Sequence, residues 1–504
     1  MDVFTSLLHG FQVALTPLNL SLAFAGTFLG TLIGALPGIG PVNGVAILIP
    51  IAYALKLPPE SALILLAGVY YGAEYGGRIA SILLNVPGDA GAVITTLDGY
   101  PMAQKGNAGE ALALSAISSF IGGTLAVIGL TLFAPYLAEW AIKFGPAEYF
   151  ALMVFAFSTL ASLAGKNPVK ALIASVFGLM LATVGIDPGS GVPRFTFGEM
   201  KLYDGVDFLV VAIGLFAISE VLTLLEHSYS GSAAQMKVRT TLVSFKTFMY
   251  SLWSILRSAL IGFFIGVLPG AGASIASAVA YTTEKRLVDR EGTFGTGDPR
   301  GVAAPEAANN AASGGAMVPM LTLGVPGSGT TAVLLGALMM FNVTPGPLIF
   351  EQRPEIVWGL IASMYIGNVM LLVLNLPLVG LFARILTVPR WLLVPSIAAL
   401  SFIGVYAVNN SAFDLLFMTG IGIVGYLMRK AGFPLAPVIL GLVLGRLMEV
   451  NLRRALSISG GDWTILYASP LSKALWILAI VSLLFPWLMG LFASRKGGRG
   501  SGER

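Results

Sequence analysis

Long apolar stretches recur along this chain of 504 residues and limit what it can fold into. About 20 consecutive apolar residues in a helix cross the hydrocarbon core of a bilayer. Transmembrane β-barrels instead show strands of about ten residues with alternating hydrophobicity, and that pattern does not occur in this sequence. The sequence therefore predicts an all-α polytopic membrane protein. The stretches that reach or approach spanning length are Leu112 to Leu132, Phe208 to Leu225, Trp358 to Leu386 and Ala474 to Phe492.

The composition supports the same class of protein and argues against several others. Only 11% of the residues are charged, against about 25% in soluble domains. Cysteine does not occur and there are only two histidines, which argues against disulfides, iron–sulfur clusters and histidine-based metal sites. The net charge is +4. Because the basic residues form no stripe interleaved with aromatic residues, we expect no nucleic-acid partner.

An internal repeat divides the chain into two halves. Gly30 to Gly40 reads GTLIGALPGIG and Gly262 to Gly272 reads GFFIGVLPGAG, with seven of eleven positions identical. A second pair of segments, SILLNVPGDAG from Ser81 and MLTLGVPGSGT from Met320, shares a Val-Pro-Gly core. Broken apolar segments at matching places in two halves are typical of secondary transporters, whose halves are often inverted relative to each other.

We expect about 12 to 14 membrane segments, arranged in two inverted repeats with broken or re-entrant helices. The linker and the tail are placed in the cytoplasm because they are rich in Lys and Arg. Four basic residues disagree with this orientation by falling outside: Arg446, Arg453, Arg454 and Lys473. The predicted parts are a first repeat at 1–226, a cytoplasmic linker at 227–247, a second repeat at 248–455, and an extra transmembrane helix with a basic tail at 456–504.

Each Leu-Pro-Gly motif predicts a helix break at membrane depth. Proline removes a backbone donor and disfavours helix in the residue before it, and glycine adopts angles that other residues avoid. Backbone groups freed in this way are tolerated only inside protein or along a wet cavity. In such a place, free carbonyls suit Na⁺ and helix N-termini suit a carboxylate. The alternative interpretation of each motif is a proline kink that serves helix packing only. The candidate ion-binding residues are Pro37, Gly38, Gly40, Asn43, Pro269, Gly270, Gly272 and Ser274.

The Val-Pro-Gly motifs predict the tips of two re-entrant hairpins. Two such tips that meet at the membrane midplane would surround a carboxylate with amides and hydroxyls and no formal positive charge. Gly88 and Gly327 are expected to let the backbone approach the ligand, with φ above zero. Asp89 is unusual for an anion site and could bind the coupling cation instead. The candidate substrate-binding residues are Asn85, Pro87, Gly88, Asp89, Gly324, Pro326, Gly327, Ser328, Gly329 and Thr330.

Other features have both a structural and a functional interpretation. Glu74 and Arg78 are four residues apart and favour an ion pair, with contact to an anion as the alternative. Asn309 and Asn310 precede the second tip and could serve either ligand. Small residues four apart favour close helix packing over a binding site. This ladder comprises Gly26, Gly30, Gly34 and Gly38 in the first half, and Ser258, Gly262, Gly266 and Gly270 in the second.

The sequence favours a carrier over an enzyme or a channel. It contains no Gly-x-Ser-x-Gly, Asp-x-Asp or His-Glu-x-x-His motif. The longest polar stretch, about residues 282–305, is too short for a soluble catalytic lobe, so we expect no enzymatic activity. Channels usually assemble their filter from several copies of one pore segment, whereas this chain has two different halves. A membrane-embedded enzyme and an anion channel are kept as the alternatives.

Taken together, the motifs resemble the large membrane subunit of the tripartite tricarboxylate transporters, the TctA family. The resemblance covers essentially the whole chain. It depends on GALPGIGP, YYGAEYGG, NVPGDAGAVITTLDGYPMAQKG, GVLPGAGA and GVAAPEAANNAASGGAMVPMLTLGVPGSG, which are specific only in combination. The glycine-rich motifs of the family fall here on Pro37, Gly38, Gly40, Pro87, Gly88, Pro269, Gly270, Gly272, Pro326 and Gly327.

The resemblance implies a function that composition and spacing alone do not. It implies a multi-pass carrier in the bacterial inner membrane that imports citrate-like tricarboxylates, while other family members take dicarboxylates and aromatic carboxylates. It implies coupling to a cation gradient, with Na⁺ as the expected ion and H⁺ as the alternative, and no cofactor. It also implies two partners, a small membrane subunit similar to TctB and a periplasmic substrate-binding protein similar to TctC.

Overall fold

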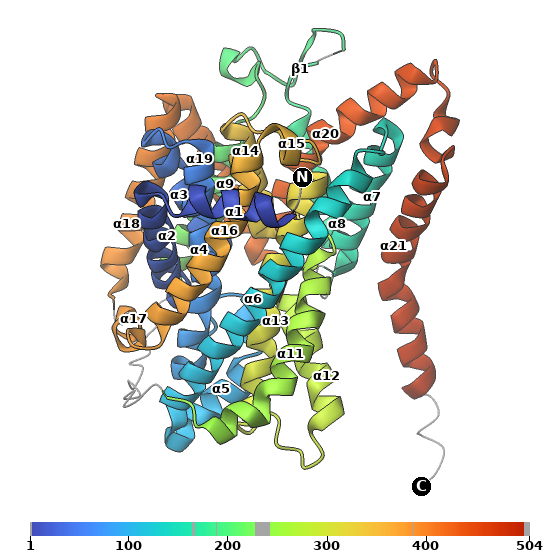
Figure 1. Ribbon diagram of the computed structural model, residues 1–504. Coiled ribbons are helices and arrows are strands. Elements are labelled where there is room, and N and C mark those ends of the chain that lie inside the picture. The colour runs from blue at the N-terminus through green and yellow to red at the C-terminus, as the bar shows by residue number, and fades with distance from the viewer. Residues whose placement is uncertain (1–2, 164–166, 188, 227–241, 387, 498–504) are drawn as a thin grey trace. The chain divides into compact units, whose positions relative to one another are not determined.

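The computed structural model describes the chain except for residues 1–2, 164–166, 188, 227–241, 387 and 498–504. Within that part, the chain consists of helices and one two-stranded antiparallel sheet, β1 (Gly185–Ile186) with β2 (Pro193–Arg194) (Figure 1). The prediction of an all-α protein is confirmed. Most of the expected linker at 227–247 and part of the basic tail lie outside the described residues.

Seven of the described helical segments are long and apolar enough to cross a membrane, which makes the protein polytopic. They are Pro17–Ala35, Thr96–Ala141, Phe208–Glu226, Phe245–Val267, Pro354–Asn375, Trp391–Asn409 and Ala412–Lys430. This number is smaller than the expected total of about 12 to 14. The difference arises because other apolar helices are short and because three long ones carry charged or polar residues: α4 (Pro59–Leu84), α13 (Pro299–Leu323) and α20 (Ala436–Ile458).

The chain forms two compact units, and neither coincides with one sequence repeat. The first unit comprises residues 1–142 and 206–431, and the second comprises residues 143–205 and 432–504. Each unit therefore takes segments from both halves of the sequence. The division of the sequence into repeats at 1–226 and 248–455 rests on the paired motifs and stays a prediction.

In the first unit, the two halves of the sequence contribute matching pairs of helices. α2 packs along α4, and α11 packs along α13. The first-half elements are α1 (Val3–Ala14), α2 (Pro17–Ala35), α3 (Gly40–Ala54), α4, η1 (Gly91–Val93), α5 (Thr96–Met102), η2 (Ala103–Asn107), α6 (Ala108–Ala141), α9 (Phe208–Ile213), η4 (Gly214–Ile218) and α10 (Ser219–Glu226). The second-half elements are α11 (Phe245–Val267), α12 (Gly272–Val288), α13, α14 (Gly329–Met340), α15 (Ile349–Gln352), α16 (Pro354–Asn375), α17 (Val379–Ile385), α18 (Arg390–Asn409) and α19 (Ala412–Lys430).

The ladder of small residues holds these helix pairs close together. A Cβ added at Gly34 would stand 2.0 Å from the carbonyl oxygen of Ala73 on α4. In the second half, a Cβ added at Gly266 would stand 2.2 Å from the carbonyl oxygen of Ala312 on α13. Real side chains do not tolerate such contacts with backbone, so only glycine permits this packing. The interpretation of the ladder as a packing surface is confirmed at Gly26, Gly30, Gly34, Gly262 and Gly266, whereas Gly38 and Gly270 belong to the helix breaks.

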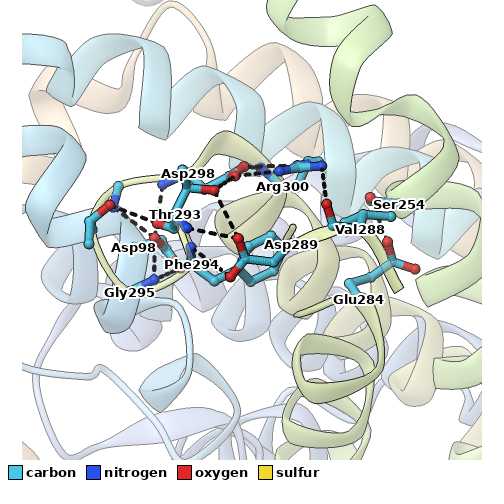
Figure 2. Close-up of polar contacts among 12 residues, drawn as sticks. Asp98, Ser254, Glu284, Val288, Asp289, Thr293, Phe294, Gly295, Asp298 and Arg300 are labelled. Carbon is cyan, nitrogen blue, oxygen red and sulfur yellow. Dashed lines mark hydrogen bonds and ion pairs between the residues drawn. The ribbon is translucent and has the colours of Figure 1, made fainter. Parts of the chain in front are cut away.

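The buried carboxylate of Asp98 on α5 connects the first half to the loop between α12 and α13. Its Oδ1 accepts hydrogen bonds from the backbone N–H groups of Gly295 at 2.9 Å, Gly297 at 2.8 Å and Asp298 at 2.9 Å. Its Oδ2 accepts one from the hydroxyl of Tyr281 at 2.8 Å. Figure 2 shows this cluster. These hydrogen bonds, three of them from the backbone of the loop, let Asp98 fix the loop that precedes α13.

Asp298, the N-cap of α13, is held in the same cluster (Figure 2). Its Oδ2 accepts hydrogen bonds from the Thr293 hydroxyl at 2.6 Å and from Arg300 Nη2 at 2.7 Å. Burial alone would raise the pKa of Asp298, but the hydrogen bonds from Arg300 and Thr293 hold it below its usual range. The start of α13 is thereby capped by a carboxylate that stays ionised.

The second unit consists of four long helices and the segment that contains the small sheet. Its elements are α7 (Pro146–Leu163), α8 (Pro168–Ala182), β1, β2, η3 (Met200–Leu202), α20 (Ala436–Ile458), η5 (Trp463–Tyr467) and α21 (Pro470–Gly497). α20 packs against α8 and α7, and α21 packs against α7. α21 corresponds to the predicted extra C-terminal helix.

An ion-pair network in the second unit involves one of the basic residues that disagreed with the expected orientation. Arg453 Nη2 lies 2.8 Å from Asp187 Oδ2 and 2.8 Å from Glu449 Oε1, and Arg194 Nη1 lies 2.7 Å from the same Glu449 oxygen. Hydrogen bonds from the backbone of Gly189 and the two nearby arginines hold the pKa of Asp187 below its usual range. The charge of Arg453 is balanced locally, which gives a physical reason for its departure from the general pattern of Lys and Arg.

Candidate functional site

The two Leu-Pro-Gly breaks have the same backbone geometry. α2 ends at Leu36 and α11 ends at Leu268, both with extended backbone. The glycine after each proline has a left-handed backbone, with φ of 87° at Gly38 and 80° at Gly270. The next helix begins two residues later at a second left-handed glycine, Gly40 in one half and Gly272 in the other. These positions require glycine because other residues rarely adopt such angles.

The two Val-Pro-Gly tips are also equivalent, and each is tied to the Leu-Pro-Gly break of its own half. α4 ends at Asn85 and α13 ends at Gly324, both in the left-handed conformation. The N–H of Gly38 donates to the carbonyl oxygen of Gly88 at 3.1 Å, and the N–H of Gly270 donates to that of Gly327 at 3.1 Å. The sequence repeat is therefore a structural repeat of one locally broken helix pair.

Both breaks border one cavity of about 270 Å³ in the first unit. Small-molecule sites usually have volumes of about 300–1,000 Å³, so this cavity suits a small ligand. The residues that line it come from both halves of the sequence. They are Gly38, Ile39, Gly40, Pro41, Val42, Asn43, Tyr70, Glu74, Asp89, Ala90, Gly91, Phe216, Gly272, Ala273, Ser274, Ser328, Gly329, Thr330 and Arg429.

Three of the described helices, α3, α12 and α14, begin at this cavity. Their first residues, which start at Gly40, Gly272 and Gly329, belong to its lining. The first N–H groups of a helix have no partner within the helix, and the helix dipole places partial positive charge there. Ser328 completes a capping box at the start of α14, and Tyr70 lies with its hydroxyl 3.4 Å from that of Ser328. Such helix starts favour an anion.

Two carboxylates, Asp89 and Glu74, lie on the same cavity. Asp89 Oδ1 accepts the N–H of Ala92 at 2.7 Å, while its Oδ2 is buried and has no hydrogen-bond partner. Glu74 is 3% exposed, and its Oε2 accepts a hydrogen bond from Asn309 Nδ2 at 2.9 Å. Neither carboxylate forms an ion pair with Lys or Arg in the part of the chain that the structure describes. A buried, unpaired carboxylate is costly, so this pair favours a bound cation or a proton.

Amide oxygens without partners accompany these carboxylates. The Oδ1 atoms of Asn43 and Asn309 are buried and accept no hydrogen bond. Asn43 lines the cavity. Asn309 Oδ1 lies 2.2 Å from the position that a Cβ on Gly91 would take, and Gly91 also lines the cavity. Unpaired oxygen acceptors beside carboxylates are the ligands that hard cations prefer.

The prediction that Glu74 forms an ion pair with Arg78 is wrong. Arg78 is 1% exposed, and its Nη1 lies 4.0 Å from Glu306 Oε2 and donates to the Ser119 hydroxyl at 3.1 Å. Its guanidinium also stands over the ring of Tyr75, 4.6 Å from the ring centre. Arg78 is thus held among α4, α6 and α13 and does not line the cavity, whereas Glu74 does.

The structure brings half of the predicted site residues together at the cavity, and the other half are not part of its lining. The predicted residues that line the cavity are Gly38, Gly40, Asn43, Asp89, Gly272, Ser274, Ser328, Gly329 and Thr330. The predicted residues outside its lining are Pro37, Asn85, Pro87, Gly88, Pro269, Gly270, Gly324, Pro326 and Gly327. The proposed ion-binding and substrate-binding motifs thus share one cavity instead of forming two separate sites.

Gly88 and Gly327 differ from their expected role. Their φ angles are not in the left-handed region, unlike those of Gly38 and Gly270. A Cβ at Gly88 would stand 2.3 Å from the carbonyl oxygen of Gly34, and one at Gly327 would stand 2.7 Å from that of Gly266. Glycine is required at these two positions because they pack against the backbone of α2 and of α11, so their role is one of packing.

The lining residues that sequence reasoning missed include the large side chains of Tyr70, Phe216 and Arg429. Tyr70 belongs to the YYGAEYGG motif, one turn before Glu74, so the spacing along α4 could have suggested it. Phe216 lies in η4, a π-helical turn, and such turns are frequent at functional sites. Arg429 lies on α19, far along the chain from every motif, and no sequence signal indicates its place at the cavity.

Comparisons with known proteins agree with this architecture. The family described as "Tripartite tricarboxylate transporter TctA family" matches residues 20–440. A relative from Agrobacterium vitis, described as an uncharacterized 52.8 kDa protein in the TAR-I ttuC' 3' region, is 41% identical over 495 residues, or 98% of each chain. An Agrobacterium vitis relative described as an uncharacterized protein in the TAR-II ttuC' 3' region is 42% identical over 234 residues, or 46% of this chain and 97% of its own. No solved structure matches the chain.

The family match includes every residue that lines the cavity and both pairs of motifs. It covers well over half of the chain, and the longer relative spans nearly all of it. The chain therefore belongs to the TctA family of the tripartite tricarboxylate transporters.

Proposed function

We propose that this protein is the subunit through which carboxylate anions cross the bacterial inner membrane, together with Na⁺. The proposal rests on one observation: three helices begin at a cavity that also holds two carboxylates. Helix starts attract an anion and the carboxylates attract a cation. TctA is a family of tricarboxylate transporters, so citrate-like tricarboxylates are the first substrates to consider.

The anion half of the site is assigned to the first residues of α12 and α14. Ser274 and Thr330 offer hydroxyl groups, and the backbone N–H groups near Gly329 offer donors that no helical carbonyl uses. These groups match the oxygen atoms of a carboxylate. Discontinuous helices of transporters typically direct such helix starts at the anionic group of the substrate.

The cation half of the site is assigned to Asp89, Glu74 and the amide oxygens of Asn43 and Asn309. Asp89 Oδ2 and the two amide oxygens are buried without partners, and Na⁺ takes oxygen ligands of these kinds. A cation bound there would offset the charge of the carboxylates and would lie in the same cavity as the substrate. Because binding linkage is reciprocal, each ligand would then raise the affinity for the other.

The energetics of import support cation coupling. An anion that enters a cell moves against an inside-negative potential, at a cost of about 2.3 kcal/mol per charge per 100 mV. The membrane potential therefore drives uptake of a substrate with two or three negative charges only if cations in excess of its charge enter with it. Na⁺ is the proposed ion, and H⁺ is the alternative that a buried carboxylate also suits.

Two partners complete the proposed transporter. The family name describes a tripartite system, which supports a small membrane subunit and a periplasmic substrate-binding protein. In that arrangement the binding protein captures dilute substrate and delivers it to this membrane subunit. We expect uptake at micromolar substrate to require it.

A membrane-embedded enzyme and an anion channel are the alternatives. Membership of a transporter family favours transport over catalysis. A carrier and a channel differ in counterflow: only a carrier exchanges labelled substrate against unlabelled substrate on the other side of the membrane. Counterflow without a driving gradient would support the carrier, and its absence during rapid net flux would support the channel.

Na⁺-dependent uptake tests the proposed function. The complex, in proteoliposomes with its binding protein, is expected to take up one or more of citrate, malate and succinate. We expect replacement of Na⁺ by choline at fixed pH to lower the initial rate at least about tenfold, because the cation site would lose its ligand. Equal rates in the two buffers would contradict Na⁺ coupling, and a rate that follows a pH gradient instead would assign the coupling to protons.

A further inference from the structure

The cavity lining contains a positively charged side chain in addition to the acidic Asp89 and Glu74. Among the described residues of the lining, this is Arg429, in the last turn of α19. Its side chain is 29% exposed. In the described part of the chain, Nη1 of Arg429 donates a hydrogen bond to Oε2 of Glu220 on α10. A guanidinium has five N–H donors, so Arg429 keeps donors for a ligand.

Glu220 fixes Arg429 beside the first helix break. Glu220 is 4% exposed. Its Oε1 lies 3.1 Å from the position that a Cβ on Gly38 would take. Gly38 therefore leaves room for this carboxylate as well as adopting a left-handed backbone. The chain of contacts runs from Arg429 through Glu220 to the Leu-Pro-Gly break that borders the cavity.

Close helix packing holds the Arg429 helix in place. A Cβ added at Gly214 in η4 would stand 2.7 Å from the carbonyl oxygen of Met418 on α19. A Cβ added at Gly422 would stand 2.4 Å from the side chain of Ile218, at the end of η4. Glycines at both contacts let α19 approach the π-helical turn that carries Phe216. Arg429 is thus presented to the cavity by a rigid element, as a specificity-determining residue requires.

We propose that Arg429 binds one carboxylate of the substrate and thereby selects substrates with two or more carboxylates over monocarboxylates. This inference rests on the proposed function, because it concerns the same cavity. The starts of α12 and α14 receive one carboxylate without formal charge, and Arg429 receives another through charge-assisted hydrogen bonds. Glu220 is a positioning residue that holds the guanidinium and balances its charge before the substrate arrives. A monocarboxylate would leave Arg429 without its ligand and would bind more weakly.

The test pairs a change in the protein with a change in the substrate. The probe is whichever of citrate, malate and succinate the wild-type complex takes up best, compared with the analogue in which one carboxylate is a primary amide. The test variant is Arg429→Gln combined with Glu220→Gln, which removes both charges and leaves no buried carboxylate unpaired. Lys430→Gln is the matched control. Lys430 directly follows Arg429 and also forms an ion pair, with Glu226, but it does not line the cavity.

We expect the wild type and Lys430→Gln to prefer the carboxylate over its amide by about 10- to 100-fold in apparent affinity. The double variant should show a preference near one. If the double variant is not recovered as a monodisperse protein, Arg429→Lys decides the question, because it keeps the charge but loses the planar fork, and its preference should fall several-fold. A preference that equals the wild-type value in the recovered variant would overturn the proposal. Failure of the wild type to take up any of the three carboxylates would instead overturn the proposed function.

Discussion

Asp89→Asn is expected to abolish Na⁺-driven uptake while the protein remains folded. Asparagine keeps the shape of the side chain and an oxygen that can accept the N–H of Ala92, as Asp89 Oδ1 does at 2.7 Å. It removes the negative charge from the buried Oδ2 that has no protein partner. Removing one member of a buried charge pair costs about 2–5 kcal/mol. We therefore expect Na⁺-driven uptake to fall at least about 30-fold.

The measurement is the initial uptake rate in proteoliposomes as a function of Na⁺ concentration. Asp462→Asn is a matched control because Asp462 also accepts a backbone hydrogen bond, from Thr464, and lies in the second unit rather than at the cavity. The control should retain the wild-type dependence on Na⁺. A wild-type Na⁺ dependence in Asp89→Asn would remove Asp89 from the proposed cation site.

Gly88→Ala and Gly327→Ala are each expected to reduce the amount of folded protein. A Cβ at Gly88 would stand 2.5 Å from the Cα of Gly77, and one at Gly327 would stand 2.8 Å from the Cα of Ala316. Backbone atoms at both contacts cannot move aside without separating the paired helices. We expect each substitution to lower the free energy of unfolding by about 3 kcal/mol, at the upper end for overpacked sites.

Monodisperse yield and thermal unfolding in detergent measure this effect. Gly420→Ala on α19 is the control, because a Cβ there would meet no atom within 4 Å. It should behave as the wild type. If the two tip variants were as stable as the control but failed to transport, the glycines would instead approach the ligand, as the sequence alone suggested.

The broken helix pairs could be predicted from the sequence because their signals are local. Proline followed by glycine at matching places indicated where α2 and α11 end, and the structure adds the same angles and hydrogen bonds in both halves. Small residues four apart indicated the close packing of each pair. These signals depend on a few neighbouring residues, so they can be recognised without knowledge of the tertiary structure.

The polar helix α13 shows where prediction of buried helices from hydropathy fails. Its first residues belong to the longest polar stretch of the sequence, yet the helix begins at Pro299 and is buried along nearly its whole length. Its polar side chains, such as Asn309 and Glu306, form hydrogen bonds with Glu74 on α4 and with Thr95, just before α5, instead of with water. An average over hydropathy cannot distinguish such a buried polar helix from an exposed loop.

The composition of the cavity could not be predicted because it depends on long-range packing. Arg429 and Phe216 reach it only through the packing of α19 on η4. The partner of Arg78 likewise comes from Glu306 in the other half, not from Glu74 on the same helix. Sequence spacing identifies residues that can meet along one helix, whereas these contacts join elements more than 200 residues apart.

Protection of a single cysteine measures whether the cavity binds the carboxylate together with Na⁺. The chain has no cysteine, so an Ala90→Cys variant carries one thiol, next to Asp89 in the cavity lining and at a residue with no assigned role in binding. Ser190→Cys, in the exposed segment between β1 and β2, is the control. With a membrane-impermeant thiol reagent, we expect the transported carboxylate plus Na⁺ to slow modification of Ala90→Cys at least about tenfold, and to leave Ser190→Cys unchanged. Equal modification rates of Ala90→Cys with and without these ligands would contradict a carboxylate site in this cavity.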